Sequence, residues 1–230
     1  MSVKTFERVE QPMYDAVLFD KDGVLVELTE LEVIHDAVDG TFAEFGVEPS
    51  RDDVERLVGC DAETVVDVCG RYGVDPGEFW RRRDANVSRV QREAFDAGEK
   101  KPYDDIGVVE RIASRCPVGV VSNNQRATVD HVVESLGMGY VETRYGREHS
   151  LQSLRRKKPS PHYVERALED IGAVDALYVG DSPKDVVAAH GADADSAFVR
   201  REHRADATLE AEPTYEVGDL HELEDELEAS

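Results

Sequence analysis

Lysine, cysteine and long apolar runs are scarce in this chain of 230 residues. Lysine and arginine together number 27, of which seven are lysines, against 50 aspartates and glutamates, so the formal net charge is −23. Proteins that bind nucleic acid need basic residues to displace counterions from the phosphates. The composition therefore argues against nucleic acid as a partner, and such a charge should also repel anionic membrane surfaces.

The same imbalance bears on the conditions in which the protein works. High salt screens charges beyond a few Å and so relieves the repulsion within a strongly acidic fold. We interpret the acidic, lysine-poor composition as adaptation to high salt, because it resembles that of proteins from halophilic archaea. An acidic protein without this adaptation is the alternative.

The cysteines and the apolar runs exclude several further classes of protein. Cys60, Cys69 and Cys116 show no paired spacing and no nearby histidines, which argues against a disulfide framework and a zinc site. No apolar run approaches the roughly 20 residues that span a bilayer. The N-terminal residues lack the apolar segment and cleavage site of a signal peptide. We expect a cytoplasmic protein, a monomer or a homodimer, with its thiols buried.

Short apolar runs rich in β-branched and aromatic residues recur along the chain and predict buried parallel strands. They cover residues 16–19, 118–121, 176–179 and 197–199, with 140–141 as a fifth candidate. Helical stretches alternate with them. Asn124 is a candidate cap for a helix over 125–136, and Gly172 is expected to end a helix that begins at Ser160 and Pro161. This alternation predicts a doubly wound α/β fold.

One region departs from this alternation and contains only helical candidates. These are residues 30–45, 52–58, 63–72 and 76–97, separated by glycine and proline. We expect an all-helical domain at 28–98, inserted into an α/β core formed by 1–27 and 99–230. The acidic tail at 222–230 is expected to be a terminal helix or a frayed end.

Two carboxylates follow the first predicted strand. Asp20 and Asp22 lie in the sequence Asp-Lys-Asp-Gly, and ligands in doubly wound sheets bind beyond the carboxyl ends of the strands. Two such carboxylates can divide the work, one as nucleophile and the other in proton transfer. A polar turn is the simpler reading, and the apolar residues that follow Gly23 exclude a calcium loop.

Polar groups follow the other predicted strands as well. Ser122 and Asn123 could bind a phosphate at a helix start, or could simply cap the helix. The pair Lys157–Lys158 could neutralise a bound phosphate, or could belong to a basic loop. Asp185 is explained by a capping box with Ser182.

Asp181 is not explained by capping. It lies behind a glycine at the end of a predicted strand. A carboxylate there suits Mg²⁺, which takes hard oxygen ligands and usually only one or two carboxylates.

Together, these four segments resemble the four motifs of the haloacid dehalogenase superfamily, and the helical insert lies where that family places its cap domain. The resemblance implies that Asp20 is the nucleophile and Asp22 the acid/base. It implies that Ser122 binds phosphate, that Lys158 neutralises charge, and that Asp20, Asp181 and Asp185 serve a Mg²⁺ site. The backbone carbonyl of Asp22 is also expected at the metal. The implied activity is hydrolysis of a small phosphate monoester through an aspartyl-phosphate.

Within the superfamily, Asp22 argues against a true dehalogenase, which lacks the second aspartate. The sequence Val24-Leu25-Val26 is similar to the branch that contains phosphoglycolate phosphatase and β-phosphoglucomutase. That branch usually continues with Asp-Ser, whereas Glu27-Leu28-Thr29 follow here. A sugar phosphomutase and a non-catalytic binding module on the same fold are the alternatives to a phosphatase.

An arginine cluster at residues 81–92 is unusual in so acidic a chain. Arg82 and Arg89 are seven residues apart and share a helix face, and Arg92 lies three residues further on. We expect these three arginines to bind an anionic part of the substrate, with a surface paired to neighbouring acids as the alternative.

Overall fold

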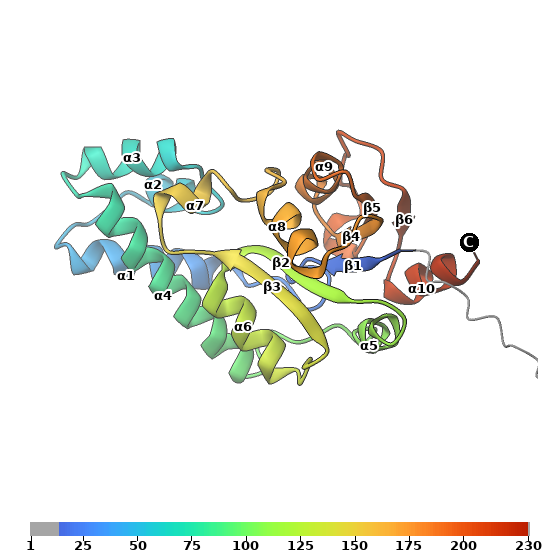
Figure 1. Cartoon of the computed structure of the whole chain (residues 1–230). Coiled ribbons are helices and arrows are strands. Elements are labelled where there is room, and N and C mark those ends of the chain that lie inside the picture. The colour runs from blue at the N-terminus through green and yellow to red at the C-terminus, as the bar shows by residue number, and fades with distance from the viewer. Residues whose placement is uncertain (1–13, 230) are drawn as a thin grey trace, which may run out of the picture.

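A computed structural model describes residues 14–229, so residues 1–13 and 230, at the two ends of the expected core, lie outside the described residues. Six parallel strands form one sheet in the order β3-β2-β1-β4-β5-β6 (Figure 1). The strands are β1 (Ala16–Phe19), β2 (Val118–Gln125), β3 (Val141–Arg147), β4 (Ala176–Gly180), β5 (Asp195–Val199) and β6 (Tyr215–Val217). The sheet confirms the predicted doubly wound α/β fold.

Helices cover both faces of the sheet. Successive residues of a strand point to opposite sides, so a strand that is apolar throughout has apolar side chains to bury on each face. In β1, Val17 and Phe19 pack against one apolar cluster, whereas Leu18 packs against another. The first cluster is covered by α5 (Gly107–Ala113), α6 (Arg126–Ser135) and α10 (Leu220–Ala229). The second is covered by α8 (His162–Ile171) and α9 (Pro183–Gly191). Both faces of the sheet are therefore buried, as the near-continuous apolar strands predict.

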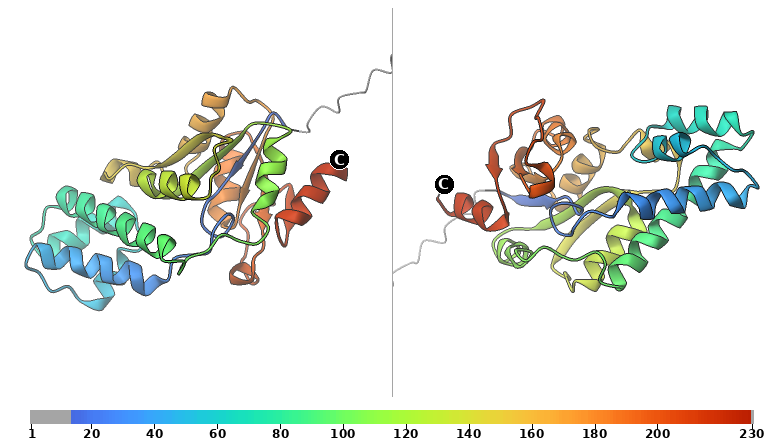
Figure 2. Two further views of the ribbon diagram at one scale, coloured as in Figure 1. Left: turned by 90° about the horizontal axis from the view of Figure 1, so that it is seen from below. Right: turned by 180° about the vertical axis from the view of Figure 1, so that it is seen from behind.

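Four helices form a separate body at one end of the sheet (Figures 1 and 2). They are α1 (Leu31–Glu44), α2 (Arg51–Arg56), α3 (Ala62–Arg71) and α4 (Pro76–Asp96). Their side chains surround an apolar core of their own, with Phe42, Phe79 and Trp80 among its largest members. We refer to α1–α4 as the helical cap.

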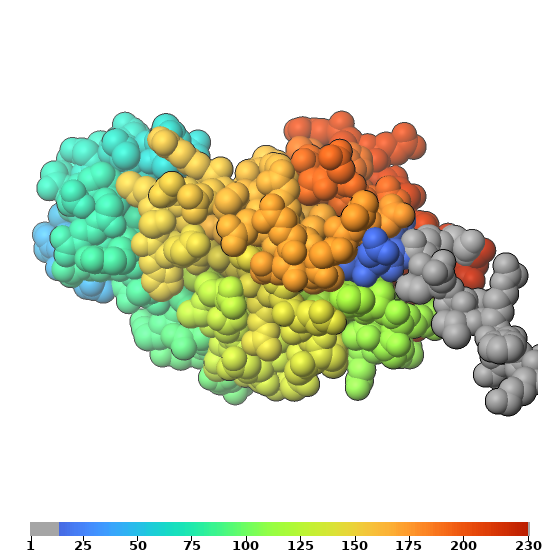
Figure 3. Space-filling view, in the orientation of Figure 1, coloured from blue at the N-terminus to red at the C-terminus, as the bar shows by residue number. Residues whose placement is uncertain are grey.

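The cap is joined to the sheet by two adjacent chain segments, and its helix α4 also packs against α6 and β2. Val26 and Pro102 form an antiparallel bridge, and the backbone N–H of Glu27 donates to the carbonyl of Lys101. The short helix α7 (Leu151–Leu154) contacts α3 and α4. In Figure 3 this yellow segment lies directly against the teal helices of the cap. The cap and the sheet thus enclose the carboxyl ends of the strands.

One boundary differs from the sequence prediction, and several short elements were not predicted. Asn124 does not cap a helix: β2 continues through Gln125, which is itself the residue before α6, and the Asn124 side chain donates instead to Asp22. The elements α5, α7 and β6 were not predicted, because they are short and carry no clear periodicity. By contrast, Gly172 ends α8 with a φ of 78°, as expected.

The described part of the chain contains no helix that is both long and apolar enough to cross a membrane. All three cysteines are free thiols. Cys69 and Cys116 are buried as expected, whereas Cys60 is partly exposed.

Candidate active site

Lys158 lies at the centre of the polar groups that follow the strands. Its side chain is 1% exposed, and its ammonium lies 3.1 Å from Asp20 and 2.7 Å from Asp185. It also donates to the hydroxyl of Tyr178 at 2.5 Å and to the carbonyl of Val121 at 3.2 Å. Burial alone would lower the pKa of Lys158, but the carboxylates of Asp185 and Asp20 outweigh it and raise that pKa. Lys158 is therefore a fixed positive charge beside Asp20.

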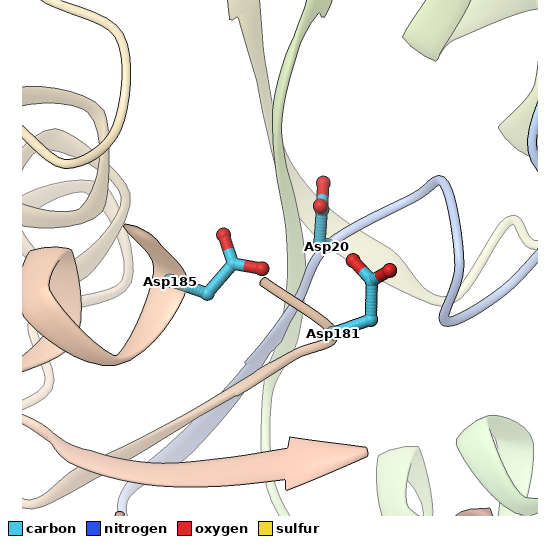
Figure 4. Close-up of side chains that lie close together, drawn as sticks. All are labelled: Asp20, Asp181 and Asp185. Atoms are coloured by element: carbon cyan, nitrogen blue, oxygen red, sulfur yellow. The ribbon is translucent and has the colours of Figure 1, made fainter. Parts of the chain in front are cut away.

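Asp20, Asp181 and Asp185 bring three carboxylates together from the ends of β1 and β4 and the start of α9 (Figure 4). Oxygen atoms of all three lie within 4.8 Å of one another. Burial and the neighbouring negative charges outweigh Lys158 and raise the pKa of Asp20 to about 6. Burial also raises the pKa values of Asp181 and Asp185. Such a cluster is stabilised by a cation bound among its oxygens.

Two glycines make room for this cluster. Gly23 has a φ of +78°, and a Cβ there would overlap the carboxylate of Asp181. A Cβ on Gly180 would likewise overlap the carboxylate of Asp185. Glycine is thus required at both places by close approach, and at Gly23 also by its left-handed backbone. The glycines of the two sequence motifs serve to bring the acids together.

Asp22 lies in a strongly basic environment. Lys21 donates to it at 2.7 Å, and Lys100 and Asn124 also contact its carboxylate. Burial alone would raise the pKa of Asp22, but the ammonium groups of Lys100 and Lys21 outweigh it and lower the pKa to about 2. Asp22 is therefore held as a carboxylate in this arrangement.

Ser122 and Asn123 lie close together but have different surroundings. Ser122 is buried at the wall of the cavity, where its hydroxyl accepts from the backbone N–H of Asn124 at 3.3 Å. The side chain of Asn123 instead holds the backbone of Lys158, donating to its carbonyl at 3.0 Å and accepting from its N–H at 2.8 Å. In this arrangement, the Asn123 amide positions Lys158.

Several contacts of the site were not predicted from the sequence. His203 and Arg204, in the 3₁₀ turn η1 (Glu202–Arg204), contact one oxygen of Asp181 at 2.7 and 3.0 Å. Lys21, Lys100 and Tyr178 were also missed. The position of Lys21 in the sequence, between two aspartates and directly after a predicted buried strand, was a signal for it. Nothing in the local sequence marks Lys100 or the residues of η1.

A cavity of about 330 Å³ lies between the sheet and the cap, with Asp20, Asp22, Ser122 and Asp181 in its lining. The cap contributes Trp80, Arg83, Val87 and Gln91 from one face of α4. A cavity of this size, with acids and a few donors at one end, suits a small polar ligand.

Arg82, Arg89 and Arg92, which the sequence analysis expected at this cavity, do not line it. Arg82 pairs with Glu78 at 2.5 Å and Arg89 with Glu93 at 2.7 Å, while Arg92 donates to the carbonyl of Ser88. The spacing correctly placed Arg82 and Arg89 on one face of α4, but the opposite face is turned to the cavity. The arginine of the cluster that does line the cavity is Arg83.

Several solved structures share the fold of this chain. CbbY from Rhodobacter sphaeroides, solved with phosphate, has a TM-score of 0.68 and 20% identity over 92% of this chain and 96% of its own. A predicted phosphoglycolate phosphatase from Haemophilus somnus has a TM-score of 0.65 and 18% identity over 93% and 97%. A predicted phosphatase from Clostridium acetobutylicum has a TM-score of 0.65 and 20% identity over 95% and 100%. At these identities the likeness establishes the fold alone.

No curated protein matched this chain in the comparison. The sequence itself establishes the family. The protein-family model for haloacid dehalogenase-like hydrolases matches residues 17–199, which extend from β1 to β5 and include Asp20, Asp22, Asp181 and Asp185. This match confirms the resemblance inferred from the four motifs. The chain is an enzyme that belongs to the family of haloacid dehalogenase-like hydrolases.

Proposed function

We propose that this hydrolase is a Mg²⁺-dependent phosphatase, which hydrolyses a small phosphate monoester through an aspartyl-phosphate on Asp20. The observation that carries the proposal is the placement of Asp20. Its carboxylate lies at the wall of the cavity, 3.1 Å from the buried ammonium of Lys158 and beside Asp181 and Asp185. Related folds solved with phosphate, such as CbbY, support the same class of substrate.

Asp20 is suited to attack phosphorus. A carboxylate oxygen would form the new bond to phosphorus while the ester oxygen leaves with the electrons of its own bond. Lys158 and the Ser122 hydroxyl would stabilise the charge on the transferring group, because both are fixed by burial before the substrate arrives. Asn123 keeps Lys158 in place through its two backbone contacts.

The same carboxylates fit a divalent metal. Asp20, Asp181 and Asp185 offer hard oxygen ligands, and Gly23 and Gly180 leave the space that their carboxylates occupy. We propose that Asp20 and Asp181 hold Mg²⁺ together with the backbone carbonyl of Asp22. When bound, the ion would supply positive charge to the phosphoryl oxygens. Asp185 would orient Lys158 and support the ligands.

Asp22 is suited to proton transfer. With its pKa lowered to about 2, it is the base that would take a proton from the attacking water when the aspartyl-phosphate is hydrolysed. In the first half-reaction it would have to enter protonated and hand that proton to the departing alkoxide, which requires that its contacts with Lys100 and Lys21 loosen so that its pKa rises. The two halves together return Asp20 and Asp22 to their starting states.

The proposal is tested on Asp20. Asp20→Asn should abolish Mg²⁺-dependent hydrolysis of a phosphate-ester panel, by about a thousandfold or more, because the amide is a poor nucleophile. The fold should survive, since the two side chains have the same shape. Asp39→Asn, an exposed aspartate on α1, is the control. Substantial turnover by Asp20→Asn would sink the mechanism, and mass spectrometry of acid-quenched wild type should detect phosphate on Asp20.

A further inference from the structure

The cavity is basic, although the protein is strongly acidic. Its lining contains five basic residues against three acids, and the acids Asp20, Asp22 and Asp181 all belong to the catalytic end. The basic residues are Arg83, Arg147, Lys157, Lys184 and Arg204. In a chain with a formal charge of −23, such a concentration of positive charge is a feature of the cavity rather than of the surface.

The basic groups at the cap end are short of negative partners. Arg83 and Arg147 both pair with one carboxylate, Asp84, each at 3.0 Å. Lys157 donates to the carbonyls of Gly59 and Cys60, at 2.8 and 2.6 Å, and forms no ion pair among the described residues. Two guanidinium groups thus share one buried carboxylate, and the ammonium group of Lys157 adds a third positive charge without an ion pair among the described residues. Burying charge without compensation is costly, so this end of the cavity favours an anion.

Two hydrogen-bond donors at the same end have no acceptor. Trp80 and Arg83 are 1% and 4% exposed, and both line the cavity. Their Nε1 and Nε atoms are two of the three buried side-chain polar atoms in residues 14–229 that lack a partner. The indole ring lies 4.6 Å from the guanidinium of Arg83 and 5.7 Å from that of Arg147. Unsatisfied donors beside surplus positive charge indicate a missing acceptor.

We propose that this cap end of the cavity, lined by Trp80, Arg83, Arg147 and Lys157, binds a second anionic group of the substrate. The inference rests on the proposed phosphatase function, in which the first anionic group is the phosphoryl group at Asp20. The substrate class is therefore a short phosphomonoester with a carboxylate or a second phosphate at its other end. Its length is bounded by a cavity of about 330 Å³ that contains both ends.

The test measures binding rather than turnover. Isothermal titration calorimetry on Asp20→Asn, at fixed Mg²⁺, compares three probes with the same carbon chain: propyl phosphate, 3-(phosphonooxy)propanoate and propane-1,3-diyl bisphosphate. The series is repeated with four and five carbons. We expect at least one bifunctional probe, that is, one with a second anionic group, to bind about tenfold or more tightly than the alkyl phosphate of the same chain length. The carboxylate and bisphosphate arms distinguish the two kinds of second group.

The preference is then assigned to residues by adding single substitutions. Arg83→Gln and Trp80→Phe should each reduce the ratio of the dissociation constant of the alkyl phosphate to that of the bifunctional probe by about fivefold or more. Arg89→Gln, an exposed arginine on the same helix, removes the same charge outside the cavity and should keep the ratio. Thermal melts establish that each variant folds. If Arg83→Gln does not fold, Trp80→Phe still tests the site, because it removes the indole donor and keeps an aromatic ring.

Two results would overturn the inference: no preference for a bifunctional probe at any chain length, or the same preference in Trp80→Phe, Arg83→Gln and Arg89→Gln. Failure of the phosphatase proposal is a separate result. A wild-type chain that hydrolyses none of these esters, while Asp20→Asn still prefers the bifunctional probes through Arg83 and Trp80, would refute the activity and retain the anion site.

Discussion

At the scale of single residues, Asp22 is tied to the connection between the sheet and the cap. Lys100 lies where the chain returns from the cap, is 3% exposed, and contacts both Asp22 and the hydroxyl of Thr29 on the outgoing segment. Thr29 in turn donates to Gln91 of α4 at 3.2 Å. The position of Asp22, the proposed acid/base, is therefore set in part by a residue that belongs to none of the sequence motifs and does not line the cavity.

We predict that Lys100→Met lowers kcat about tenfold or more, because Asp22 loses the group that holds its carboxylate in place. KM should change less, since Lys100 does not line the cavity. Steady-state kinetics of the variant measures both. Lys100→Arg should recover part of kcat, and Lys101→Met, its exposed neighbour, should match the wild type. An unchanged kcat with a raised KM would contradict this role.

Asp181 is the residue through which the metal proposal can be tested. We predict that Asp181→Asn weakens Mg²⁺ binding by about tenfold or more, because the amide oxygen is a poorer ligand for a hard cation. Calorimetric titration with Mg²⁺ measures the affinity directly, without substrate. Asp206→Asn, an exposed aspartate two residues beyond η1, is the control. Identical titration curves for Asp181→Asn and the wild type would show that Asp181 is not a ligand.

At the scale of elements, the sequence predicted most of the sheet because its strands are buried on both faces. Continuous apolar runs identified β1, β2, β4 and β5, and only the start of β3. The partly exposed strand β6 has no such run and was missed. The carboxyl ends of the predicted strands then located the acids, since parallel strands end at one edge. Lys158 lies beyond α7 and not at the end of a strand, so only the family resemblance identified it. Contacts from η1 and the linker could not be predicted, because they depend on tertiary packing.

Helix α4 illustrates a second limit. Equal spacing shows which residues share a face but not which face is buried. The face with Trp80, Arg83, Val87 and Gln91 is the one at the cavity. Trp80 and Val87 lie three residues before and four residues after Arg83. These apolar neighbours could have indicated that the face with Arg83 is buried and that the face with Arg82 and Arg89 is exposed.

Helices α2 and α3 are joined by a polar network around Asp53, which is 4% exposed. Arg56 and Arg71 donate to one oxygen at 3.0 and 2.9 Å, and Tyr72 and Ser50 donate to the other at 2.8 and 3.1 Å. Burial would raise the pKa of Asp53, but these hydrogen bonds outweigh it and lower the pKa.

A lowered pKa means that Asp53 stabilises the fold above its unfolded value of about 4, and that this contribution is lost as pH falls through the folded value. We predict that Asp53→Asn is less stable at pH 7 by about 1–3 kcal/mol. The difference should shrink below about pH 4. Denaturant unfolding at several pH values measures it, with the exposed Asp52→Asn as control. A difference that does not depend on pH would contradict the argument.

At the scale of the whole molecule, charge is distributed unevenly. The formal charge is −23, yet the cavity lining has more basic than acidic residues. Arginines on the surface are mostly paired with nearby acids, as in Arg51 with Glu55 at 2.9 Å and Arg126 with Asp130 at 2.8 Å. The unpaired excess of acids therefore leaves a repulsive surface around a basic cavity. The proposed anionic substrate would approach the cavity through the ions that screen this surface.

Salt acts on this surface in two opposite ways. It weakens exposed ion pairs, each of which contributes only about 0–1 kcal/mol. It also weakens the repulsion among 50 acids that outnumber the basic residues by 23. Because the excess charge is large and the exposed pairs are individually weak, relief of the repulsion should dominate. The stability of the fold is therefore expected to rise with salt.

We predict that the melting temperature rises by several degrees between dilute buffer and molar KCl, since each kcal/mol of stability shifts it by about 2–4 °C in a chain of this size. Most of the rise should occur below about 1 M, where the Debye length has already fallen to about 3 Å. A rise that continues in proportion to concentration would instead indicate exclusion of salt from the protein surface. Calorimetric melts across the series separate these cases. A flat or falling melting temperature would remove the interpretation of the acidic composition as adaptation to high salt, while leaving the catalytic proposal untouched.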